Sequence, residues 1–111
     1  MKIAALSLAL ILSLNITPAI AADEGNAALV AIGEINGTAL ACQQMAIVSR
    51  ARNAVATTAP KTRANGEIFE EATNSSFLAF GKDKKTCPDA GALTQRLNDA
   101  EKRLSAAFAQ K

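Results

Sequence analysis

Cys42 and Cys87 are the side chains best suited to covalent chemistry in this 111-residue chain. Redox-active pairs usually occur as C-x-x-C, and the two cysteines stand far apart. Copper would call for methionine or histidine ligands, but the chain has no histidine and only Met45 is close in sequence. In an exported chain the pair predicts one structural disulfide, which would contribute roughly 4 kcal/mol by closing a long loop.

Three glutamates could act as acids or bases, and they fall within about one helical turn: Glu67, Glu70 and Glu71. Catalysis by paired carboxylates needs groups on opposite walls of a cleft, so this spacing favours a solvated face. Without histidine, the serines have no partner for a histidine-based triad. We therefore expect no enzyme activity, no catalytic residue, no metal site and no cofactor.

Four basic residues flank the expected corner between the first two helices: Arg50, Arg52, Lys61 and Arg63. The two arginines before the corner suit the negative end of a helix dipole. The other two lie where the next helix begins, and positive charge is unfavourable there. This conflict indicates a contact with a partner or an anion. The alternative is a solvated corner balanced by the glutamates of the following helix.

The first 21 residues have the organisation of a cleaved export signal. Lys2 precedes an apolar run over residues 3–14, and an Ala-Ile-Ala sequence ending at Ala21 fits signal peptidase. We expect cleavage there, or after Ala22, leaving one helical domain over 22–111 in the periplasm or outside the cell. An uncleaved membrane anchor is the alternative, because the apolar segment is just long enough to span a bilayer.

The overall composition narrows the classes of partner. Half the residues are hydrophobic and 20% are charged, which predicts a folded chain rather than a disordered one. A net charge of +2 argues against bulk nucleic-acid binding. The chain has no Trp or Tyr and four Phe, so it offers few platforms for stacking on bases.

Apolar residues recur every three or four positions in three segments, which predicts helices. These run over 26–58, from Pro60 to about residue 80, and from Pro88 onwards. Asn65-Gly66 weakens the first turns of the second segment, so a start near Asn65 is the alternative there. We therefore expect a small all-α three-helix bundle with one disulfide. Asn36-Gly37 is a candidate break in the first helix, and a break would make the bundle four-helical. The lengths of the first two segments bring the chain back to the level of Cys42, so we expect the disulfide to tie the middle of the first helix to the start of the last.

Small residues recur every fourth position in the first helix, at Gly33, Gly37 and Ala41. Such a stripe lets another backbone approach closely, and here it favours tight packing within the fold over a membrane interface. Residues 26–38 could instead project as an apolar partner-binding surface, but we favour a place in the core.

Three runs of sequence carry a resemblance to a known family: residues 33–42 (GEINGTALAC), 59–63 (APKTR) and 66–70 (GEIFE). They resemble small exported proteins of the KikA type, which are encoded in the transfer regions of conjugative plasmids. The resemblance covers most of the exported domain. It implies a periplasmic accessory to plasmid transfer, or to the killing of a particular host. The family offers no catalytic residues to assign.

The leading interpretation is a non-enzymatic accessory protein that binds another envelope protein. A second is an inhibitor or a small-anion binding module that uses the four basic residues at the corner. A third is a membrane-active effector, suggested by the alanine-rich segment 27–48. Membrane contact is the less favoured of these alternatives, and no nucleic-acid partner is expected.

Overall fold

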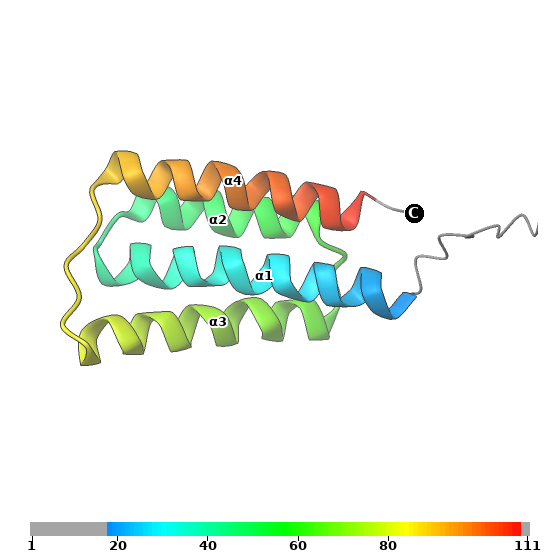
Figure 1. Cartoon of the computed structure of the whole chain (residues 1–111), viewed down its shortest axis with the longest axis horizontal. Coiled ribbons are helices and arrows are strands. Elements are labelled where there is room, and N and C mark those ends of the chain that lie inside the picture. Colours follow the sequence, from blue (N-terminus) through cyan, green and yellow to red (C-terminus); the bar gives the residue numbers. More distant parts are fainter. Residues whose placement is uncertain (1–17, 110–111) are drawn as a thin grey trace, which may run out of the picture.

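The computed structural model describes residues 18–109 and shows four helices with no strand among them (Figure 1). They are α1 (Pro18–Ala41), α2 (Met45–Thr58), α3 (Arg63–Lys82) and α4 (Ala90–Phe108). The all-α bundle is confirmed, in its four-helix form. Residues 1–17, which hold most of the expected export signal, lie outside the described residues.

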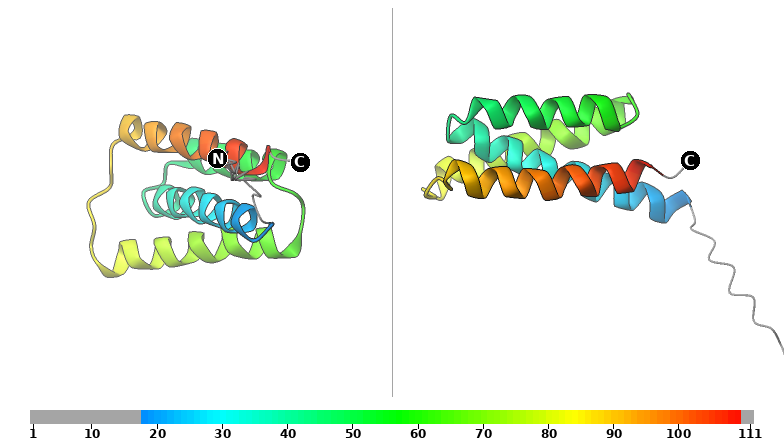
Figure 2. Two further views of the ribbon diagram at one scale, coloured as in Figure 1. Left: turned by 45° about the vertical axis from the view of Figure 1, so that its right-hand side comes forward. Right: turned by 90° about the horizontal axis from the view of Figure 1, so that it is seen from above.

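Helix α1 occupies the centre of the bundle and packs against each of the other three helices. In Figure 1 and in the left view of Figure 2 it lies between α3 on one side and α4 on the other. Helices α1 and α3 run in one direction, and α2 and α4 run in the other. The α2 backbone also approaches α4, whereas the α3 backbone approaches only α1 among the described helices. Helix α3 is therefore held to the bundle along one side.

The expected single helix over 26–58 is wrong, because the chain turns at residues 42–44 rather than at Asn36-Gly37. Gln43 adopts a left-handed conformation with φ of 58°. The N–H of Gln44 then donates to the carbonyl of Ala39 at 2.8 Å, which satisfies a free carbonyl at the end of α1. Residues other than glycine seldom adopt this conformation. Because glutamine rather than glycine stands at this position, the sequence did not indicate the turn.

Helices α3 and α4 also begin a little later than the prolines suggested, because polar side chains cap them. The Thr62 hydroxyl accepts a hydrogen bond from the N–H of Asn65 at 3.1 Å. The Asp89 carboxylate accepts one from the N–H of Ala92 at 2.7 Å. The predicted starts at Pro60 and Pro88 are therefore wrong by two or three residues.

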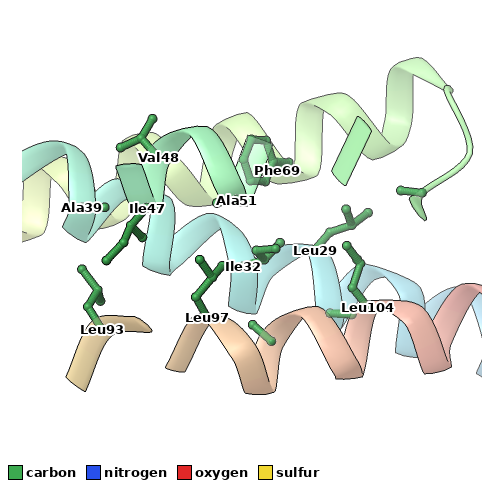
Figure 3. Close-up of a cluster of buried hydrophobic side chains, with 13 residues drawn as sticks. Leu29, Ile32, Ala39, Ile47, Val48, Ala51, Phe69, Leu93, Leu97 and Leu104 are labelled. Atoms are coloured by element: carbon green, nitrogen blue, oxygen red, sulfur yellow. The ribbon is translucent and has the colours of Figure 1, made fainter. Parts of the chain in front are cut away.

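The core draws on all four helices, and Figure 3 shows its larger side chains meeting around α1. Leu29 and Ile32 of α1 are fully buried, as are three leucines spaced along α4. Phe69 contributes the main α3 side chain at 4% exposure. The segment 26–38 is thus part of the core, as favoured from the sequence, and does not project.

The α1–α3 contact depends on the predicted stripe of small residues. A Cβ atom at Gly33 would lie 2.9 Å from the Phe69 carbonyl oxygen. One at Gly37 would overlap the carbonyl oxygen of Thr73. Between them, the fully buried Asn36 donates from Nδ2 to the Thr73 hydroxyl at 3.1 Å. The prediction that Gly33 and Gly37 allow close packing within the fold is therefore confirmed.

The predicted Cys42–Cys87 disulfide is present, with 5.7 Å between the two Cα atoms. It joins the turn after α1 to the loop between α3 and α4, at one end of the bundle. The expectation that it ties the middle of the first helix is wrong, because α1 ends at Ala41. A disulfide fits folding in an oxidising compartment.

Candidate functional groove

The surface is hollowed along one side of α1, where α3 and α4 stand on either side without touching each other's backbones. We call this hollow the α3/α4 groove. Its volume is about 1350 Å³. It exists because the α3 backbone approaches that of α1 but not that of α4, which leaves the space between α3 and α4 open to solvent.

Each helix contributes residues at helical spacing, so the groove runs along the helices. The floor comes from α1, with a stripe of residues four apart and two further residues beside it: Asn26, Val30, Glu34 and Thr38, with Ala31 and Ile35. The walls come from residues 68–80 of α3 and residues 93–103 of α4. Apolar side chains, including Ile35, Ile68, Phe80 and Leu93, line much of the channel.

The charged side chains of the groove are partly separated by sign. Glu34 on the floor and Glu71 on the α3 wall are acidic. The α4 wall carries Arg96 and Arg103, with Asp99 between them. The α4 wall is therefore net basic, and the rest of the channel formed by α1 and α3 is acidic.

One end of the groove is formed by the loop between α3 and α4, which contributes Lys85, Thr86 and Pro88 to its lining. Two contacts hold this loop against the end of α1. One is the disulfide at Cys87. The other is a 3.0 Å hydrogen bond from the Gln44 side-chain amide to the carbonyl of Pro88. The disulfide thus fixes the shape of one end of the groove.

The four basic residues named from the sequence lie outside the groove lining. Arg50 reaches α4, where it pairs with Glu101 at 2.7 Å. Arg52 reaches α3, where it pairs with Glu70 at 2.8 Å and lies over the Phe69 ring. The two α2 arginines are thus engaged by different helices.

Lys61 and Arg63 are exposed at the start of α3, and neither belongs to the two ion pairs found among the described residues. A partner or anion contact at the four basic residues stays a prediction. The three glutamates of α3 also diverge, since Glu70 pairs with Arg52 while Glu71 lines the groove.

Removing either α2 arginine is expected to have a small effect on stability. The side chains of Arg50 and Arg52 are each 46% exposed, and exposed ion pairs contribute less than about 1 kcal/mol. Arg50→Ala and Arg52→Ala should therefore each lower the free energy of unfolding by less than about 1 kcal/mol. Urea unfolding followed by far-UV circular dichroism measures this, with Lys61→Ala as the control. A loss several times larger would show that these pairs are structurally essential.

The sequence indicated no role for Arg96, Asp99 and Arg103, and it did not predict the groove. The available signal was weak: alanine and serine, rather than large apolar residues, follow one side of α3 at Ala72, Ser75 and Ala79. Small residues beside a buried stripe leave a channel rather than a filled interface.

Neither a metal centre nor a membrane span emerges from residues 18–109. No group of three or more Cys, Asp or Glu side chains in this range is placed to hold a metal ion. None of the helices from α1 to α4 combines the length and apolar character needed to cross a bilayer. The groove offers apolar contact and charged side chains outside the two ion pairs of the described residues, which suit binding. Comparison with protein-family models, curated proteins and solved structures finds no match to this chain.

Proposed function

We propose that this chain is an exported, non-enzymatic accessory protein that binds another envelope protein through the α3/α4 groove. The observation that carries the proposal is the open channel along α1, which has an apolar lining and charged walls. The resemblance to KikA-type proteins suggests the system: plasmid conjugation or the killing of a particular host.

Export is supported by two features of the fold. The disulfide fits an oxidising compartment such as the periplasm. Burial is described from residue 22 onwards, and the first buried residue there is Gly25, which packs against the Phe108 ring. It lies after both candidate cleavage positions, so removal of the signal at Ala21 or Ala22 would leave every buried residue that the structure describes in place.

The proposal is tested by photo-crosslinking in the cell envelope. A photoreactive amino acid replaces Ser75 in the groove of the full-length chain. A matched version replaces Ala56, an exposed residue of α2 outside the groove. We expect a discrete adduct with one envelope protein, identified by mass spectrometry, from position 75 and not from position 56. No adduct from the groove, or the same adducts from both positions, would refute the proposal.

A further inference from the structure

We infer that the α3/α4 groove takes a single amphipathic α-helix of a partner protein, with its acidic flank along α4 and its basic flank along α3. This inference rests on the proposed function, because it names the partner segment that the same surface would bind.

The dimensions of the groove fit a short helix. The floor residues from Asn26 to Thr38 and the α3 wall from Ile68 to Phe80 each extend about 18 Å at 1.5 Å per residue. The α4 wall from Leu93 to Arg103 extends about 15 Å. A channel of this length accommodates about three turns of helix. Small side chains on the α3 wall, such as Ser75 and Ala79, let that helix approach closely.

A helix suits these walls better than an extended peptide does. Each wall and the floor is itself a helix, so their backbone groups are already paired within the helix. No strand edge exists among residues 18–109 to which a peptide could add. An extended peptide would lose water from its backbone N–H and C=O groups without gaining partners, whereas a helix pairs its own.

The floor also disfavours an acyl chain as the occupant. Glu34 stands in the middle of the floor stripe, four residues from both Val30 and Thr38. A hydrocarbon chain lying along the groove would remove water from this carboxylate without pairing it. A basic side chain on the α3 flank of a bound helix can pair with it instead, because Glu34 lies on the α3 side of the floor, where its backbone carbonyl accepts a hydrogen bond from the Ser76 hydroxyl at 2.9 Å.

The charged side chains of the groove are available to determine which flank of the bound helix faces each wall. The two ion pairs among the described residues, Arg50–Glu101 and Arg52–Glu70, leave the groove charges unused. Arg96 and Arg103 would attract acidic residues to the α4 side, while Glu34 and Glu71 would attract basic residues to the other. A helix reversed end to end exchanges its two flanks, so this separation also fixes the direction in which the partner runs.

The test uses three synthetic helical peptides that share one face of leucine and alanine. The mixed peptide carries Glu on one flank and Lys on the other, the second carries Lys on both, and the third is the mixed peptide with a central proline. Each is titrated to about 1 mM, the weak end of the binding range, into the oxidised, isotope-labelled protein. We expect the mixed peptide to shift the amide signals of groove residues. The proline peptide should bind at least about tenfold more weakly, because proline breaks the helix.

A charge-reversal variant gives the sharper comparison. Arg96→Glu with Arg103→Glu makes both walls acidic, so the order should reverse: the Lys-flanked peptide tightens about tenfold and the mixed peptide weakens. Because this variant still binds one peptide, loss of fold cannot produce the reversal. Arg50→Ala with Arg52→Ala, outside the groove, should leave the original order unchanged.

Equal binding of the proline peptide, no reversal, or no shift at the highest concentration would overturn the inference. Shifts of groove signals with protein concentration alone would assign the groove to a second copy, which also overturns it. These failures are separable from failure of the proposed function. If an envelope adduct forms at position 75 but peptide binding does not depend on a helix, the groove remains a binding surface and the helical occupant is rejected. If no adduct forms, the proposed function is rejected.

Discussion

Replacing both Cys42 and Cys87 by serine is expected to lower the free energy of unfolding by about 4 kcal/mol. The disulfide joins residues 45 positions apart, and closing so long a loop removes many conformations from the unfolded chain. Domains of this size are stable by only about 5–15 kcal/mol, so the loss is a large share of the total. Because the chain lacks Trp and Tyr, far-UV circular dichroism during urea unfolding is the suitable measurement.

Two controls separate the covalent link from the side chains. Each single serine variant should match the double variant, since one cysteine alone cannot form the bond. Wild-type protein under a reducing agent should unfold at the same urea concentration as the double variant. If the double variant stayed within about 1 kcal/mol of the oxidised protein, packing alone would hold the bundle together.

Gly37→Ala and Gly66→Ala should change stability in opposite directions. At Gly37 the new methyl group would overlap the Thr73 carbonyl oxygen and lie 2.8 Å from Ser76 Cβ, so α1 and α3 must separate. We expect a loss of about 2–3 kcal/mol, typical of overpacking in a core. At Gly66 nothing lies within 4 Å, and alanine should add up to about 1 kcal/mol through its helix propensity.

The pair is measured by urea unfolding of both variants beside the wild type. Each exchanges the same atoms within an α-helix, so their difference isolates the α1–α3 contact. A stabilising effect at both positions would mean that the two helices are not held in close backbone contact.

The sequence predicted the helical class, the disulfide and the tight packing of Gly33 and Gly37, because each follows from local spacing or composition. It did not predict the turn that ends α1. Gln43 adopts its left-handed conformation without the glycine that usually marks such a turn. The first residues of α3 and α4 lie after the predicted prolines, because the helices begin at the side-chain caps Thr62 and Asp89.

The groove could not be predicted in the same way, because it is a property of packing between elements distant in sequence. Arg96 and Arg103 repeat on a polar face that is indistinguishable from an ordinary solvated face. Only the three-dimensional arrangement shows that α3 and α4 both rest on α1 without meeting. For the same reason, nothing local indicated that Arg50 and Arg52 would be engaged by glutamates of two different helices.

The contact between Gly25 and Phe108 brings the first helix against the end of the last, so both lie at the same end of the bundle (Figure 1). A polypeptide leaves the ribosome or a translocation channel with its N-terminal part first. Helix α1, the centre of the core, therefore emerges long before α4 can cover it. During this interval the apolar surface of α1 is exposed. The correct disulfide cannot form until Cys87 has also emerged. The complete core therefore cannot form until α4 has been released.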